Sequence, residues 1–127
     1  NGTIWLKISR AWSFPIDQRL SYVENVTKAC QNQGLKVGIS SSAEDWTVVM
    51  DSQKAGSDTL KALPLWYSNW DGNSKDFNDF EYARFGTWDI PEMKNYGDGD
   101  KFVFCSEWAS SLNYYEPNAS RVVLYAL

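Results

Sequence analysis

The chain has 127 residues, an apolar fraction of 43% and a formal net charge of −4, so it is long enough for one domain with a hydrophobic core. The negative charge argues against nucleic-acid binding, which needs a basic surface, and no apolar run approaches the roughly 20 residues of a membrane-spanning helix. With no His and two Cys, a zinc site and a Ser–His–Asp triad are excluded, and there is no Gly-rich phosphate loop. We therefore expect neither a metal nor a cofactor.

The predicted elements alternate between strands and helices, as in a β/α repeat. In chain order they are a strand over residues 4–9, a helix over 17–33, a strand over 35–40, a short helix from 41 or 42 to 50, and strands over 63–68, 93–96, 102–105 and 121–127. Gly34 ends the first helix, and the strand over 35–40 is apolar enough to be buried on both faces, as in parallel sheets. Residues 51–61 and 70–89 are predicted to be loops, and a loop as long as the second is usually functional or mobile.

Four or five parallel strands with so few helices cannot close an eight-stranded barrel. We therefore predict a single α/β domain over residues 1–127, built as a partial, open (β/α) barrel of mostly parallel strands with a β-prone tail at 118–127. An open sheet has unpaired edges that another chain or segment can cover. The sequence opens on Asn1 rather than Met, so we expect a processed product, a fragment or the ordered part of something longer.

A series of short motifs runs through almost the whole chain. They are 4–8 (IWLKI), 35–40 (LKVGIS) with Trp46 downstream, 63–71 (LPLWYSNWD), 77–80 (FNDF), 85–88 (FGTW), 91–96 (PEMKNY), and Cys105 followed by 112–115 (LNYY). In this order they resemble the motifs of the family-25 glycoside hydrolases, the muramidases that cut the glycan strands of bacterial peptidoglycan. The resemblance covers the second half of the family's barrel, and the first strands of that barrel have no counterpart here.

The resemblance implies that the family's catalytic acids are replaced in this chain. It places an Asp and a Glu, two residues apart on one strand, at Lys7 and Ser9, whose side chains point the same way because strand residues alternate faces. It places a third acid at Ser111. A glycosidase needs two carboxylates about 5–5.5 or 6.5–9.5 Å apart, and neither an ammonium nor a hydroxyl performs their roles. We therefore expect no catalytic residue and an inactive, muramidase-like protein.

Four other acids are candidates to replace the missing pair. They are Asp71, Asp89, Glu92 and Glu107. No two of them have a spacing that forces their carboxylates together, and solvated loop acids are the ordinary alternative. An active muramidase with relocated acids is therefore the third-ranked hypothesis.

Seven Trp and seven Tyr in a chain of this size suit either a thick core or a sugar-binding face. The resemblance implies that residues at the strand ends line a glycan cleft. The candidates are Trp66, Tyr67, Trp70, Asp71, Trp88 and Tyr96. The alternative is that Trp66, Trp88 and three Phe residues of the long loop pin that loop to the barrel.

Cysteines and glycosylation sequons indicate a secreted protein. Cys30 and Cys105 are candidates for one disulfide, although two unpaired buried thiols are an alternative. Three N-x-Ser/Thr sequons begin at Asn1, Asn25 and Asn118. We therefore expect an extracellular glycoprotein.

Two functions compete for such a protein. The first is structural self-assembly, in which the tail over 121–127 adds to a sheet edge of a neighbouring subunit; the alternative for the tail is an internal strand of the same domain. The second is glycan binding in the former cleft. The expected partners are therefore a second chain at the exposed strand edges or a glycan.

Overall fold

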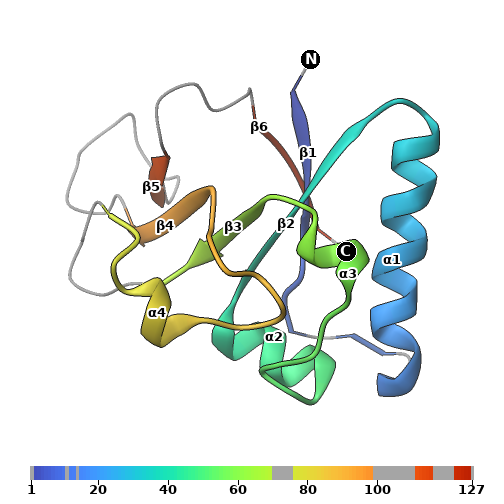
Figure 1. Ribbon diagram of the computed structural model, residues 1–127, viewed down its shortest axis with the longest axis horizontal. Coiled ribbons are helices and arrows are strands. Elements are labelled where there is room, and N and C mark those ends of the chain that lie inside the picture. Colours follow the sequence, from blue (N-terminus) through green and yellow to red (C-terminus); the bar gives the residue numbers. More distant parts are fainter. Residues whose placement is uncertain are drawn as a thin grey trace.

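The computed structural model describes residues 2–10, 12–13, 15–69, 76–98, 111–115 and 122–126 (Figure 1). Within these residues the chain forms six strands: β1 (Thr3–Lys7), β2 (Lys36–Ser42), β3 (Leu65–Ser68), β4 (Met93–Asp98), β5 (Ser111–Tyr115) and β6 (Val122–Ala126). It also forms the helices α1 (Ile16–Asn32), α2 (Ala43–Met50), α3 (Asp58–Lys61) and α4 (Phe80–Ala83). None of these helices is long and apolar enough to cross a membrane.

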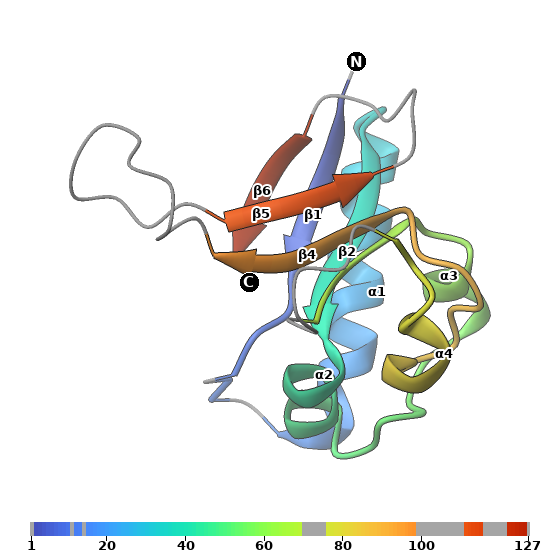
Figure 2. The ribbon, with the colours of Figure 1, turned by 90° about the vertical axis from the view of Figure 1, so that its left-hand side faces the viewer.

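The strands form one sheet in the order β5-β4-β3-β2-β1-β6. All neighbouring strands are parallel except β5, which is antiparallel to β4. The sheet twists so strongly that β4 and β5 run nearly across the direction of β1 and β2 (Figure 2). It does not close, because β5 and β6 form its two edges. The predicted open, mostly parallel α/β fold is therefore confirmed.

The C-terminal strand lies in the chain's own sheet. β6 pairs with β1 in parallel, from Thr3 opposite Val122 to Lys7 opposite Ala126. The tail is thus the internal strand of the alternative prediction, which corrects the expectation that it pairs with a neighbouring subunit. Pairing with β1 satisfies backbone groups that an edge strand leaves exposed. β5 was not predicted, and the strand predicted over 102–105 lies outside the described residues.

The hydrophobic core lies between the sheet and the helices. Alternate residues of the central strands, such as Leu6, Ile39 and Leu65, are buried on this face. They pack in one cluster with Val23 of α1 and with residues of α2. Strand alternation explains why this face is continuous, because paired residues of parallel strands point to the same side.

Local sequence signals explain where the helices begin and end. The Ser42 hydroxyl accepts a hydrogen bond from the backbone N–H of Asp45, 3.1 Å away, and so caps α2 as predicted. Ser57 caps α3 in the same way. Gly34 follows α1 with a φ of +78°, a conformation that favours glycine. The short helices α3 and α4 lie in segments predicted to be loops, because a single helical turn carries too little periodicity to be recognised.

The opposite face of the sheet carries two neighbouring indole side chains, those of Trp5 and Trp66. The Trp5 indole lies over Gly38, where a Cβ atom would come within 2.6 Å of its ring carbons. Trp5 also meets Trp66 edge to face, with ring centroids 5.8 Å apart. Gly38 is therefore required by the close approach of Trp5, and this contact supports Trp66 beside the cavity described next.

Candidate functional site

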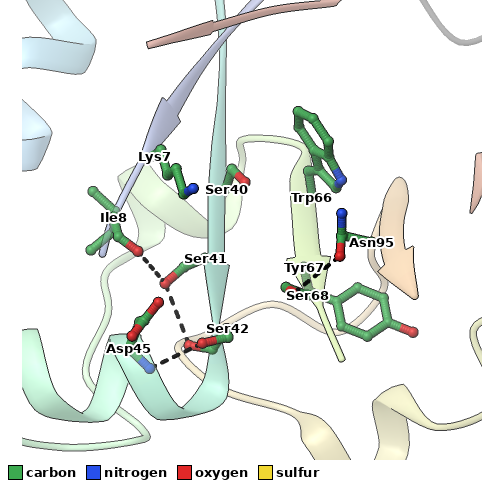
Figure 3. Close-up of a pocket in the computed structure, with 10 residues that line it drawn as sticks. All are labelled: Lys7, Ile8, Ser40, Ser41, Ser42, Asp45, Trp66, Tyr67, Ser68 and Asn95. Carbon is green, nitrogen blue, oxygen red and sulfur yellow. Dashed lines mark hydrogen bonds between the residues drawn. The ribbon is translucent and has the colours of Figure 1, made fainter. Parts of the chain in front are cut away.

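A cavity of about 290 Å³ opens at the carboxyl ends of the parallel strands (Figure 3). Such strand ends are where open α/β sheets usually bind ligands. The residues that line it are Lys7, Ile8, Ser40, Ser41, Ser42, Asp45, Trp66, Tyr67, Ser68 and Asn95. The lining therefore combines polar side chains with apolar surface, and it includes two aromatic residues, Trp66 and Tyr67.

The strand register places the polar side chains of the cavity in two rows. Lys7 pairs with Ser40, and Ser40 pairs with Trp66, so these three side chains share one face of the sheet. Two residues further on, Ser42 pairs with Ser68, and Ser68 pairs with Asn95. In this second row the Ser68 hydroxyl donates to Asn95 Oδ1 at 3.5 Å. The rows form a surface of hydroxyl, amide and ammonium groups next to an indole.

The two positions that the resemblance gives to catalytic acids are treated differently by the fold. β1 ends at Lys7, which is exposed and lines the cavity. Ile8 then turns into the core, donates its N–H to the Ser40 carbonyl and accepts from the Ser41 hydroxyl. Ser9 follows the strand and is not among the lining residues. Ser111 begins β5, and its side chain is outside the described part of the chain.

Asp45 supplies the single carboxylate among the described residues that line the cavity. Arg10 Nε donates to Asp45 Oδ1 at 2.8 Å, and the same guanidinium pairs with Glu44. The hydrogen bonds that the Arg10 guanidinium donates to Glu44 and Asp45 raise the pKa of Arg10 above its usual value. Sequence analysis did not predict this pair, because 35 residues separate Arg10 from Asp45. The cavity carboxylate is thus engaged by a permanent cation.

The aromatic candidates divide into cavity and core residues. Trp66 is half-buried and lines the cavity, whereas Tyr67 contributes to the lining with a fully buried side chain. Trp88 is also buried, and its indole N–H donates to the Leu63 carbonyl at 2.9 Å. Tyr96 is buried as well. Trp88 and Tyr96 are therefore core residues rather than cleft residues, while Trp70 and Asp71 lie outside the described residues.

The aromatic residues in and after the long loop follow the alternative prediction, in which they pack against the core and hold the loop to the sheet. Phe80, Phe85 and Trp88 are buried in the core cluster, and Phe77 packs against it. Trp46 meets both Phe85 and Trp88, with centroids 5.8 and 5.2 Å away. Asp89 and Glu92, two of the acids considered as replacements, are exposed and do not line the cavity. Glu107 lies outside the described residues.

A buried polar network behind the cavity was missed by the sequence analysis. Asp79 accepts hydrogen bonds from the Tyr67 hydroxyl and the Asn69 amide, both at 2.6 Å, and from Lys94 Nζ at 2.9 Å. Burial alone would raise the pKa of Asp79, but the hydrogen bonds from Asn69, Tyr67 and Lys94 outweigh it and hold the pKa below its usual value. Tyr67 and Lys94 lie opposite each other on β3 and β4. The network therefore fixes two strands that line the cavity.

The described residues include one of the two cysteines and one of the three sequon asparagines. Cys30 packs against the core and forms no disulfide with another described residue. Its candidate partner, Cys105, lies outside the described residues, so the disulfide stays a prediction. A small apolar role is common for cysteine. Asn25 is on the exposed face of α1, whereas Asn1 and Asn118 lie outside the described residues. Within the described part of the chain, no cluster of three metal-ligating side chains occurs.

Comparison with known proteins finds lysozyme-like relatives. The family described as Lysozyme-like protein 1 matches residues 1–96. The chain is similar to Probable GH family 25 lysozyme 4 of Dictyostelium discoideum, at 36% identity over 77% of this chain and 43% of the relative. It is also similar to Probable GH family 25 lysozyme 3 of the same organism, at 33% identity over 75% of this chain and 19% of the relative. A third similar protein of that organism is Counting factor 50, at 32% identity over 73% of this chain and 30% of the relative.

The matched regions cover only part of this chain and only part of each relative. The chain spans less than half the length of these curated relatives. The family match ends at residue 96, so β5 and β6 lie beyond it and flank the matched strands on both sides of the sheet. No solved structure matches the chain.

Proposed function

We propose that this chain, which belongs to the lysozyme-like family of glycoside hydrolase family 25, binds a glycan in the Lys7 cavity without hydrolysing it. The single observation that supports the proposal is the composition of that cavity. It lies where a ligand is expected in this kind of sheet, yet Lys7 stands at the strand end where the resemblance implies an acid.

The absence of hydrolysis follows from the requirement for two carboxylates. One must hold a proton near neutral pH, and the other must act as nucleophile or base at a defined separation. The described lining offers Asp45 alone, and Arg10 pairs with it. A single carboxylate that is already bonded to Arg10 leaves the second of the two roles unfilled.

Glycan binding is supported by the chemistry that remains. The serines in the two rows and Asn95 provide groups that donate and accept hydrogen bonds to sugar hydroxyls. Trp66 provides an apolar ring edge or face for the CH groups of a sugar. A few polar groups around an apolar surface is the usual composition of a small-ligand site.

Replacing Trp66 by Ala should weaken binding of soluble peptidoglycan fragments or chitin oligosaccharides by about tenfold, the effect of losing roughly 1.4 kcal/mol of contact. Tyr82→Ala is the matched control, since Tyr82 is 88% exposed on α4 and does not line the cavity. Calorimetric titration of the wild type and both variants provides the measurement. Undetectable binding by the wild type, or equal losses in the two variants, would contradict the proposal.

Self-association through the sheet edges is the second candidate function. It is favoured by the open sheet, whose edge strands β5 and β6 each have one side without a strand partner among the described residues. Such edges can pair with a second chain. In this proposal the sheet edges of two chains pair with each other. The tail does not leave its own domain, because β6 already pairs with β1.

We also propose that the protein is secreted and N-glycosylated. Asn25 is exposed, which allows a glycan to project from α1, whereas Thr27 of the same sequon is fully buried. Recognition of Thr27 by a glycosylating enzyme therefore has to precede folding. The modification should occur during synthesis and be absent from protein that is treated after folding.

Two measurements on secreted protein test N-glycosylation and self-association: intact mass tests the first, and light scattering tests the second. Intact mass should fall on enzymatic removal of N-glycans, and Asn25→Gln should lower the starting mass by one glycan. Light scattering under native conditions should show dimers or larger species that increase with concentration. A mass equal to that of the bare chain would eliminate the glycosylation proposal, and a monomer at every concentration would eliminate self-association.

A further inference from the structure

We infer that the Lys7 cavity selects glycans that carry an anionic group, with the Lys7 ammonium binding the anion while Trp66 contacts the sugar ring. This inference rests on the proposed glycan-binding function and names the class of ligand. Its chemistry is a carboxylate or a sulfate on a sugar. Both are anions that an ammonium recognises as a point charge.

Lys7 has a positive charge that the described residues leave uncompensated. It is exposed at the end of β1 and lines the cavity. The Lys7 ammonium forms no hydrogen bond or ion pair with another described residue, whereas the ammonium of the buried Lys94 pairs with Asp79. Among the described residues, therefore, none competes directly with a ligand anion for the Lys7 ammonium.

The spacing of Lys7 and Trp66 fits one sugar unit. They share a row of the sheet and are separated by Ser40 on the strand between them (Figure 3). Two interstrand spacings place their Cα atoms roughly 9–10 Å apart. A ring that contacts Trp66 thus leaves an exocyclic acid group within reach of the flexible Lys7 side chain, with the Ser40 hydroxyl between them.

The remaining charges at the cavity do not oppose an anion strongly. The Asp45 carboxylate lines the cavity, but Arg10 is bonded to it at 2.8 Å and also pairs with Glu44, which does not line the cavity. The whole chain is acidic, with a net charge of −4. Non-specific attraction therefore does not explain anion binding, and any preference has to arise locally.

The test compares acidic and neutral forms of the same sugar. Oligogalacturonate is titrated beside its methyl ester, and sulfated chondroitin oligosaccharides beside unsulfated ones, so that the two pairs show whether a carboxylate or a sulfate is recognised. We expect the wild type to prefer the acidic member of at least one pair by about tenfold, as for one charge-assisted hydrogen bond. The preference should decline as salt is added, because the site is open to solvent.

Three variants assign the preference to Lys7. Lys7→Met keeps the length of the side chain and should abolish the preference, whereas Lys7→Arg should retain most of it. Lys36→Met is the matched control, since it removes the same charge from an exposed lysine at the opposite end of the sheet. Thermal melting checks that each variant is folded.

The possible outcomes separate this inference from the proposed function. Equal binding of acidic and neutral sugars, or an equal effect of Lys7→Met and Lys36→Met, overturns the acidic preference alone. Binding of no glycan by the folded wild type overturns the proposed function as well. A preference that follows Lys7 in the variants supports both.

Discussion

Asp79→Ala should lower the free energy of unfolding by about 3–5 kcal/mol, the usual cost of removing one partner from a buried ion pair. The Lys94 side chain is fully buried, and Asp79 is its ion-pair partner at 2.9 Å. The same substitution removes the acceptor of the Tyr67 hydroxyl and the Asn69 amide. Three donors then lose their acceptor, and two of them, Tyr67 and Lys94, belong to fully buried side chains.

Urea denaturation provides the measurement, and Asp89→Ala provides the matched control. Asp89 is largely exposed and pairs with Lys61 at 3.1 Å on the surface, so its loss should cost less than about 1 kcal/mol. Adding Lys94→Met to Asp79→Ala should recover part of the stability, because it removes the stranded charge. An Asp79→Ala variant within 1 kcal/mol of the wild type would show that the network contributes little.

The same residue makes stability depend on pH. The pKa of Asp79 is held below its ordinary value of 3.8 in the folded state, so its contribution is fully present above that ordinary value. The contribution is lost as pH falls through the depressed pKa, because the unfolded chain then binds the proton first. The stability difference between the wild type and Asp79→Ala should therefore narrow below about pH 4.

The network also connects stability to the cavity. Tyr67 lines the cavity, and Lys94 lies opposite it on the next strand. Asn69 follows the end of β3. Asp79 thus acts as a positioning residue for the strand ends that carry Trp66 and Asn95.

Much of the fold was predictable because it depends on local patterns. The apolar segment at residues 35–40, the cap at Ser42 and the glycine after α1 each indicate an element without reference to the rest of the chain. The open sheet followed from counting strands. The short helices α3 and α4 were not predicted, because a single helical turn is too short to show a hydrophobic period.

The site was less predictable because its key contacts join distant residues. Alternation along a strand shows that Lys7 faces away from Leu6, but does not show that β1 ends before Ser9. The Asp79 network and the Arg10–Asp45 pair depend on how separate elements pack. Burial of Trp88 and Tyr96 likewise depends on how distant segments pack, and a motif alone does not distinguish a core aromatic residue from a cleft residue.

The position of β6 is a further long-range feature. Its composition predicted a strand, but not its neighbour. The structure places it next to β1, the strand farthest from it in the sequence, while β5 lies at the other edge. Both strands follow the part of the chain matched by the family. The match covers 43% of one lysozyme-like relative, so that relative has further chain outside the matched part.

The largest expected effect is the loss of glycan hydrolysis through replacement of the catalytic carboxylates. Enzymes commonly accelerate their reactions by at least about 10⁶-fold, and a glycosidase owes this mainly to its two carboxylates. With Lys7 at one expected position and Asp45 held by Arg10, we expect the chain to lose essentially all of that acceleration. Bound glycan should then remain intact.

The most direct test follows binding and cleavage in one sample of purified chain and peptidoglycan glycan strands. Co-elution measures the bound glycan, and the release of new reducing ends measures hydrolysis, with an active muramidase as the positive control. We predict saturable binding, and reducing ends at the level of a protein-free sample. Repeated turnover that saturates with substrate would contradict the account.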